Sequence, residues 1–321
     1  MMERFSDFMA RALYDPERGY YTRRIRDVGG NRGDFATSAT LSDRLGQAIA
    51  AWLRAEKGAT NIIEIGAGNG ALMQQVQRNL GWWRRLKWHF HIVEKSPVLQ
   101  DLQKQRLGGK VTWWQSVEEA LDACNGKALI YSNELIDAFP CTIAVWDATA
   151  RIWQESWIDE GREVLRPLEM SEAQIASFSA LRDWPTPPQD GQRIELHAMA
   201  RDWLKAWALH WKSGSILTID YGDTFPALYH RRKTGTLRAY LLHQRLTGAE
   251  VWQNVGRQDI TADVNFTDLR AWSSSLGWAE KSYTSQREFL QQWAPHHRAD
   301  PQLAMPGGAD DAFQCLIAQK S

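Results

Sequence analysis

The most informative segment of this chain is Asn61-Ile62-Ile63-Glu64-Ile65-Gly66-Ala67-Gly68-Asn69-Gly70. It begins with a short apolar run, which is typical of a buried strand, and a helical pattern over Leu72–Leu80 follows it. Glycine lets the backbone approach a ligand closely, and the free N–H groups at a helix start favour the anionic end of that ligand. The segment therefore predicts a strand–loop–helix unit that holds a cofactor; a glycine-rich turn without a ligand is the alternative.

Two cofactor classes fit this glycine pattern. Gly66, Gly68 and Ala71 satisfy the G-x-G-x-x-G/A fingerprint of dinucleotide-binding proteins. Glu64 stands two residues before the first glycine and Gly70 completes G-x-G-x-G, and both features favour S-adenosylmethionine (SAM). We therefore predict SAM as the cofactor and keep an NAD-dependent oxidoreductase as an alternative.

Strand and helix patterns alternate after the glycine segment. Short apolar runs are found at His89–Val93, Val111–Trp114 and Ala128–Tyr131, with helical patterns between them. Such alternation predicts an α/β fold, in which helices cover both faces of a parallel sheet. A further buried strand is expected at Ser215–Tyr221.

These patterns divide the chain into three expected regions. Residues 1–60 are predicted to form an N-terminal helical extension that packs on the core. Residues 61–140 and 214–321 are expected to form the SAM-binding core. The alternation stops in residues 141–213. There, a hairpin pattern and helical patterns over Glu172–Leu181 and Ala198–Trp211 predict an inserted α+β segment on the substrate side.

Composition and charge exclude several function classes. The 321 residues include 38 Lys and Arg and 38 Asp and Glu, so the formal net charge is zero. A net charge of zero argues against a protein that coats nucleic acid and against one that binds membranes over its whole surface. It still allows a local charged patch. The 17 tryptophans could form a stacking platform for bases or sugars, but without surplus basic residues they are better interpreted as core.

Cysteine usage and the first residues bear on location. Cys124, Cys141 and Cys315 are far apart, which fits a reducing compartment and gives no zinc pattern. The first 22 residues contain acidic side chains, unlike a mitochondrial transit peptide. We therefore expect a cytoplasmic protein with no metal and, since no run of about 18 apolar residues exists, no membrane insertion.

Polar side chains follow two of the predicted strands. Glu94 ends the strand His89–Val93, where a carboxylate can accept hydrogen bonds from both ribose hydroxyls of an adenosine; an exposed strand-end glutamate is the alternative. Asn133, Glu134 and Asp137 follow the next strand but one, at the edge where open parallel sheets bind ligands. If this loop opens a helical turn, its two carboxylates share one face, although a polar helix start explains the same residues equally well.

More polar groups lie late in the chain. Each alone is a turn with polar side chains, but together they are typical of the lining of a substrate pocket. The candidate substrate-binding residues are Asp220, Tyr221, Arg238, Tyr240, His243, Asp259, Thr261 and Asn265.

An ordered set of motifs resembles the MidA-like family of SAM-dependent methyltransferases, which is related to a mitochondrial complex I assembly factor. The motifs are Gly33–Ser38, Glu64–Gly70, Glu94–Pro97, Asn133–Pro140, Asp220–Gly222, Gly235–Tyr240 and Asp259–Phe266. The resemblance implies a Rossmann-like class I methyltransferase core with a mainly parallel seven-stranded sheet. It also implies methyl transfer to a protein side chain, with an arginine guanidino nitrogen favoured.

The resemblance suggests roles for individual residues. Asp34, Thr37 and Ser38 would join the glycine segment and Glu94 in the cofactor site. Glu134 and Asp137 would bind an arginine acceptor and take its proton, while Asn133 positions it.

Three residues depart from the family pattern. Ala39 stands where proline is usual, Cys141 where an aliphatic residue is common, and Asp263 where a histidine is expected. The expected partner is a protein substrate, for instance a respiratory-complex subunit, and no nucleic acid. A non-catalytic SAM-binding assembly factor for a respiratory or other complex is a further alternative.

Overall fold

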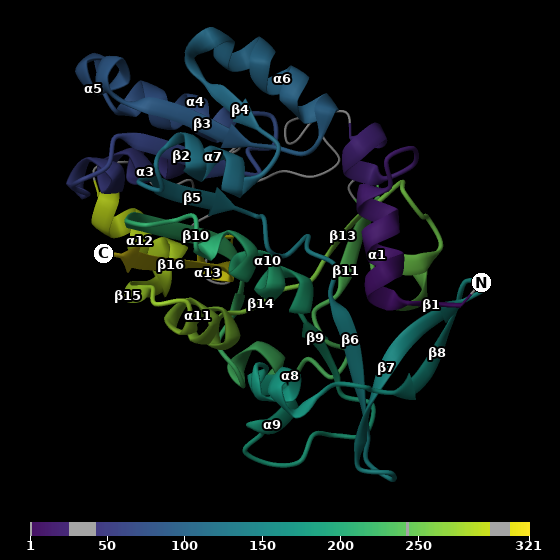
Figure 1. The fold of residues 1–321 in the computed structure, drawn as a ribbon. Helices are drawn as coiled ribbons and strands as arrows, with labels where there is room; N and C mark the ends of the chain where they lie inside the picture. The colour runs from purple at the N-terminus through teal and green to yellow at the C-terminus, as the bar shows by residue number, and fades with distance from the viewer. Residues whose placement is uncertain (1, 26–42, 242–243, 296–308) are drawn as a thin grey trace. The chain divides into compact units, whose positions relative to one another are not determined.

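The structure is a computed structural model that describes residues 2–25, 43–241, 244–295 and 309–321 (Figure 1). It contains two compact units, and each is described by itself. The core unit comprises Ile25–Leu135, Lys205–Tyr221 and Ser273–Ser321. The accessory unit comprises Met1–Arg24, Ile136–Leu204 and Gly222–Trp272.

A central sheet organises the core unit, with the strand order β15-β16-β10-β5-β2-β3-β4. Its strands are β2 (Asn61–Ile65), β3 (His89–Val93), β4 (Thr112–Trp114), β5 (Leu129–Asn133), β10 (Gly214–Asp223), β15 (Ala279–Ser285) and β16 (Phe313–Lys320). The strands from β4 to β10 are parallel, and β16 runs antiparallel to both of its neighbours. The predicted α/β, Rossmann-like sheet of seven mainly parallel strands is thus confirmed.

Helices cover this sheet. They are α3 (Arg44–Ala55), α4 (Ala71–Asn79), α5 (Trp82–Lys87), α6 (Pro97–Leu107), α7 (Val117–Ala123), α12 (Gln286–Trp293) and α13 (Ala309–Ala312). Helix α6 begins as the sequence predicts, because the Ser96 hydroxyl accepts from the Leu99 N–H at 3.3 Å and Pro97 occupies the first turn. Ile62, Ile92 and Leu129 are fully buried, as expected for strands that are covered on both faces.

The accessory unit is built on a five-stranded sheet with the order β1-β7-β6-β9, in which β8 also pairs with β7. These strands are β1 (Glu3–Arg4), β6 (Thr142–Asp147), β7 (Ile152–Asp159), β8 (Arg162–Pro167) and β9 (Arg193–Leu196). Since β1 pairs with β7, the start of the chain and the predicted insertion share one sheet. The three predicted domains stay a prediction.

The rest of the accessory unit consists of short elements. A three-stranded sheet contains β11 (Arg238–Leu241), β12 (Gln244–Leu246) and β13 (Asp259–Thr261), and β14 (Val264–Asn265) pairs with the end of β10. The helices are α1 (Phe5–Tyr14), α8 (Glu172–Ala176) and α9 (Ser179–Arg182), and α10 (Ala198–Ala208) and α11 (Phe266–Ser275) extend into the core unit.

Several predicted elements need correction. The helix expected over 172–181 is split into α8 and α9, and the one expected over 198–211 ends at Ala208. Helix α5 and strand β8 were not predicted, because neither shows a clear apolar period. Tryptophans are core residues at Trp52, Trp207 and Trp211, but Trp82 and Trp83 are largely exposed.

Two further observations concern the described ranges as a whole. None of their helices is long and apolar enough to cross a bilayer. They also contain no group of three or more His, Cys, Asp or Glu side chains arranged to hold a metal ion.

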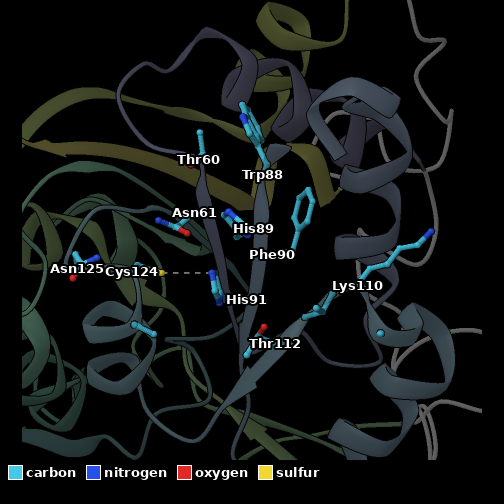
Figure 2. A pocket seen from close by; sticks show the side chains of 13 residues that line it. Thr60, Asn61, Trp88, His89, Phe90, His91, Lys110, Thr112, Cys124 and Asn125 are labelled. Atoms are coloured by element: carbon cyan, nitrogen blue, oxygen red, sulfur yellow. Dashed lines mark hydrogen bonds between the residues drawn. The ribbon is translucent and has the colours of Figure 1, made fainter. Parts of the chain in front are cut away.

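A cavity of about 620 Å³ lies at the amino ends of β2, β3 and β4 in the core unit (Figure 2). This is the opposite edge of the sheet from the glycine loop, which follows the carboxyl end of β2. Thirteen residues line the cavity, among them Trp88, His89 and Lys110, and none of the thirteen is acidic.

His91 and Cys124 face each other in this cavity, with Sγ 3.5 Å from Nε2, while the Trp114 indole N–H donates to Nδ1 of His91 at 3.1 Å. Burial lowers the pKa of His91 to about 4 and raises the pKa of Cys124 to about 11. Both groups are therefore neutral near pH 7, and the pair is not an activated thiolate.

We expect Cys124 to resist alkylation in the folded protein. A pKa of about 11 leaves about one thiolate in ten thousand at pH 7, and the side chain is buried as well. Iodoacetamide treatment followed by peptide mass spectrometry should find Cys124 unmodified in the native chain and modified in urea. Modification of the native chain as fast as a free thiol would contradict this neutral, buried environment.

Candidate active site

The glycine loop joins β2 to α4 in the core unit. Gly66, Gly68 and Gly70 have φ angles of 70°, 53° and 78°, a region that other residues rarely adopt. The Gly66 N–H donates to the Val93 carbonyl at 3.0 Å, which ties the loop to the end of β3. The Gly70 N–H donates to the Ala67 carbonyl at 2.8 Å and closes the turn. The backbone itself therefore fixes the shape of this loop.

Space as well as backbone angle requires glycine here. A Cβ on Gly66 would lie 2.8 Å from Cδ1 of Leu135. A Cβ on Gly70 would lie 3.2 Å from Cδ1 of Leu107 and 3.3 Å from Cγ of Gln103. The loop thus combines a left-handed backbone with close packing against the side chains of Leu135, Leu107 and Gln103.

A buried network connects the loop to Glu94. The Gln103 amide donates to the Gly68 carbonyl at 2.8 Å and to Oε2 of Glu94 at 3.2 Å. The Ser96 N–H donates to Oε1 of Glu94 at 2.9 Å, and the Trp113 indole donates to Oε1 of Gln103 at 2.9 Å. Gln103 therefore fixes the Glu94 carboxyl relative to the loop.

Gln103 is a residue that the sequence reasoning missed. It is fully buried on α6 and lies between Leu99 and Leu107, four residues from each. An amide in the middle of an apolar face was the available signal, because a buried amide needs partners.

Burial shifts both acids of this region. Glu64 is 2% exposed and its pKa rises to about 8, although the Tyr131 hydroxyl donates to its Oε2 at 2.9 Å. Glu94 is 8% exposed and its pKa rises to about 7, because the hydrogen bonds from Ser96 and Gln103 offset burial only in part. Near neutral pH, a ligand that donates hydrogen bonds can therefore change the charge of Glu94.

The end of β5 presents an unusual pair. Nδ2 of Asn133 donates to Oε1 of Glu134 at 2.9 Å, and Glu134 has a φ of 53°. Oδ1 of Asn133 is buried and finds no hydrogen-bond partner among the described residues. An unpaired buried acceptor is costly, so it marks a place where a ligand could donate.

Asp220 holds this loop in place. It is fully buried, and its carboxylate accepts from the Leu135 N–H at 3.1 Å and from the Tyr221 N–H at 2.9 Å. The Glu134 N–H donates to the Ile219 carbonyl at 3.0 Å, so β10 fixes the loop at two points.

Glu134 and Asp137 do not share a helical face, because the loop does not open a helical turn, and the alternative of a polar helix start is not met either. No helical turn connects them, because the left-handed φ of Glu134 breaks a helix at its start. Asp137 belongs to the accessory unit, where its carbonyl accepts from the Ala262 N–H at 2.9 Å.

The accessory unit gathers a second polar cluster. The Tyr21 hydroxyl donates to Oδ1 of Asp259 at 2.8 Å, and Arg238 forms an ion pair with Asp263. Burial raises the pKa of Tyr21, with Asp259 and Asp137 adding to the effect. Burial alone would lower the pKa of Arg238, but the Asp263 carboxylate raises it, so this guanidinium stays charged.

Asp263 was singled out in the sequence because a histidine is expected there. Arg232 also pairs with Asp263, at 2.5 Å. An imidazole could not accept from two guanidinium groups in this way, so Asp263 and its arginines form one ion-pair network.

The remaining predicted residues are in varied environments. Asn265 donates to Ser179 at 2.9 Å and to Asp268 at 3.1 Å, and its Oδ1 accepts from the Thr267 N–H, so these hydrogen bonds fix the start of α11. Oγ1 of Thr261 is buried without a partner in the described part of the chain. Asp34, Thr37, Ser38 and His243 lie outside the described residues, as does Ala39.

Comparison with known proteins identifies the family. The family described as "Putative S-adenosyl-L-methionine-dependent methyltransferase" matches residues 45–284. A crystal structure from Burkholderia thailandensis, described as a "likely methyl transferase" bound to S-adenosyl-homocysteine, has a TM-score of 0.83 and 25% identity. It covers 99% of this chain and 88% of its own. A second structure from the same organism, of an uncharacterised protein, has a TM-score of 0.79 and 24% identity over 99% and 87% of the two chains, and shows the same fold.

Two relatives of this chain are also named as methyltransferases. The mitochondrial protein arginine methyltransferase NDUFAF7 of Xenopus laevis is 28% identical over 83% of this chain and 65% of its own length. Its Drosophila melanogaster homolog is 27% identical over 85% and 67%. This chain thus spans about two thirds of their length. Both are named as mitochondrial, which contradicts the cytoplasmic location expected from the sequence.

These findings confirm the predicted MidA-like resemblance and favour SAM over the NAD alternative. The chain belongs to this family of S-adenosyl-L-methionine-dependent methyltransferases.

Proposed function

We propose that this chain transfers a methyl group from SAM to a protein side chain, with an arginine guanidino nitrogen as the acceptor. The observation that carries the proposal is the preformed glycine loop, hydrogen-bonded through Gln103 to the buried carboxyl of Glu94. The names of the NDUFAF7 relatives support arginine as the acceptor.

The core unit offers a fitting place for the cofactor. The glycine loop would hold the methionine part of SAM, and Glu94 would accept hydrogen bonds from the ribose hydroxyls. Oδ1 of Asn133, which lacks a partner among the described residues, offers a further buried acceptor. Bound SAM supplies a methyl group on a positively charged sulfur. Glu64, which bonds to Tyr131 inside the core, would support the loop from beneath.

The acceptor must lose a proton as its new N–C bond forms. A guanidinium is a poor nucleophile because its charge is delocalised and its pKa lies above about 12. A carboxylate can bind the guanidinium fork and take this proton. We assign that role to Glu134, and we assign Asn133 to positioning the Glu134 carboxylate through their 2.9 Å hydrogen bond.

Other predicted residues would bind or position the acceptor protein. Arg238 and Asp259 belong to the charged cluster of the accessory unit, and we retain them as substrate-binding candidates together with Tyr240, Tyr221 and Thr261. Asp137, which the sequence analysis predicts as a second catalytic carboxylate, lies in the same cluster, and we now propose that it binds the acceptor. Asp220 and Asn265 are better candidates for positioning, since they form hydrogen bonds with neighbouring residues of the chain itself.

A transfer assay tests the proposal. Purified chain and methyl-labelled SAM are added to a cell lysate, and the labelled proteins are analysed by mass spectrometry. We expect methylated arginine that depends on the chain. If the chain binds SAM and no protein becomes labelled, the non-catalytic assembly factor is the correct alternative.

Gly68→Val should abolish SAM binding. Valine at a φ of 53° is strained by at least about 1–2 kcal/mol, and its branches would fill space beside the loop. Isothermal titration calorimetry measures the affinity, and circular dichroism checks the fold. Unchanged affinity in a folded variant would refute the cofactor assignment.

Glu134→Gln should keep SAM affinity within about twofold but lower turnover by at least about 100-fold, because the amide cannot take a proton. Glu160→Gln is a matched control, since Glu160 is exposed and also has a positive φ of 48°. Full turnover by the Glu134 variant, or an equal loss in the control, would exclude Glu134 as the essential carboxylate.

The affinity for SAM should depend on pH through Glu94. Its pKa is raised to about 7 in the free chain, and the ribose hydroxyls bind the ionised form. Below pH 7, Glu94 is mostly protonated in the free chain and must release this proton when SAM binds. The Kd should therefore rise by up to about tenfold for each unit by which the pH falls below 7, and it should be constant well above pH 7. Glu94→Gln should remove this dependence; a variant with the same pH profile as the parent would show that another group is responsible.

A further inference from the structure

Helix α5 belongs to the core unit (Figure 1), and it exposes an unusual set of side chains. Its sequence is Trp82-Trp83-Arg84-Arg85-Leu86-Lys87, and none of these residues is buried. Trp82, Trp83 and Leu86 are 61%, 60% and 73% exposed. Single exposed apolar residues are common on protein surfaces, but three within one short helix mark an interaction site.

The helix separates apolar from charged side chains. At about 3.6 residues per turn, Trp82, Leu86 and Trp83 share one side. Arg85 and Lys87 flank that side, and Arg84 is opposite. This is the pattern of an interfacial helix, in which indoles enter the headgroup region of a bilayer and cations contact lipid phosphates.

The local charge is strongly positive in a chain with no net charge. No acidic residue occurs anywhere from Ile65 to Val93. Within the described structure, Arg84, Arg85 and Lys87 have no ion-pair partner. The cavity in Figure 2 continues this surface of aromatic and basic side chains. Trp88 and His89 follow α5 directly and line the cavity together with Lys110.

We propose that α5 docks the core unit on the surface of a membrane that contains anionic phospholipids. Trp82, Trp83 and Leu86 would enter the interfacial layer, and Arg84, Arg85 and Lys87 would contact phosphate groups. The helix does not cross the bilayer, so this is peripheral binding, and it does not depend on the proposed methyl transfer.

Other partners fit this surface less well. The two indoles stack on each other, with ring centroids 3.9 Å apart, so their facing sides cannot take up a nucleic-acid base. Leu86 offers no flat ring for stacking either. A stable protein interface uses about 20–30 residues on each side, far more than one six-residue helix, whereas a bilayer needs no complementary shape.

Vesicle flotation with the full chain tests the proposal. We expect the chain to float with vesicles of phosphatidylcholine and phosphatidylglycerol and to remain unbound with phosphatidylcholine alone. The triple variant Arg84→Gln, Arg85→Gln, Lys87→Gln should bind about 100-fold more weakly, since each cation near an anionic surface contributes about fivefold. The double variant Trp82→Ala, Trp83→Ala should also lose binding to the vesicles of phosphatidylcholine and phosphatidylglycerol.

A matched control removes the same charge elsewhere. Arg162→Gln, Lys233→Gln and Lys281→Gln change three exposed cations outside α5 and should leave flotation unchanged. Circular dichroism melting confirms that each variant is folded.

Four results would overturn the proposal. The first three are an absence of binding to anionic vesicles, an equal loss in the control, and equal binding to neutral vesicles. Binding of single-stranded RNA that depends on α5, without flotation, would also overturn it and assign the patch to nucleic acid.

Discussion

The edge of the core unit where we propose the cofactor site depends on one constraint, the left-handed backbone of the glycine loop. The Gly66 N–H reaches the Val93 carbonyl, so the loop after β2 is tied to the end of the neighbouring strand. That strand end leads directly to Glu94, and Gln103 then connects Glu94 back to Gly68. A side chain at Gly66 would collide with Leu135, which lies beyond the third strand end, that of β5. Three strand ends are therefore coupled through backbone geometry that glycine alone permits without strain.

The two buried acids of this region differ in what surrounds them. Glu64 faces the core, where its hydrogen bond comes from Tyr131, and a carboxyl whose pKa is raised to about 8 can sit there in its neutral form. Glu94 lies at the strand end and accepts from a backbone N–H and from an amide that is itself fixed by Trp113. Because this carboxyl is held in position and its pKa is near 7, it can accept further hydrogen bonds from a ligand near neutral pH. The same residue type thus supports the loop in one position and can meet a ligand in the other.

Much of the fold was predictable because strands covered on both faces give continuous apolar runs and glycine marks the ends of elements. The runs at β2, β3 and β5 and the Ser96–Pro97 start of α6 are examples. Helix α5 was not predictable, since an exposed helix has no buried face to impose a period. The left-handed φ of Glu134 was also hidden, because the loop is fixed by hydrogen bonds from the Glu134 N–H to Ile219 and from the Leu135 N–H to Asp220, each about 85 positions away in sequence. The roles of Gln103 and Tyr21 likewise depend on partners that are distant in sequence.

The two edges of a parallel sheet are chemically different, and this chain has different side chains at each of them. All carboxyl ends of β2, β3 and β5 point to one edge, where N–H groups and acids meet. Helix α4 then carries the chain back over about 13 Å, at about 1.5 Å per residue, to the other edge, where α5 and the cavity lie. A sequence with equal numbers of acids and bases can therefore still hold a basic, aromatic surface, because its acids are concentrated elsewhere. Docking through α5 would leave the glycine loop on the edge away from the membrane, so that lipid binding and cofactor binding would not compete for the same residues.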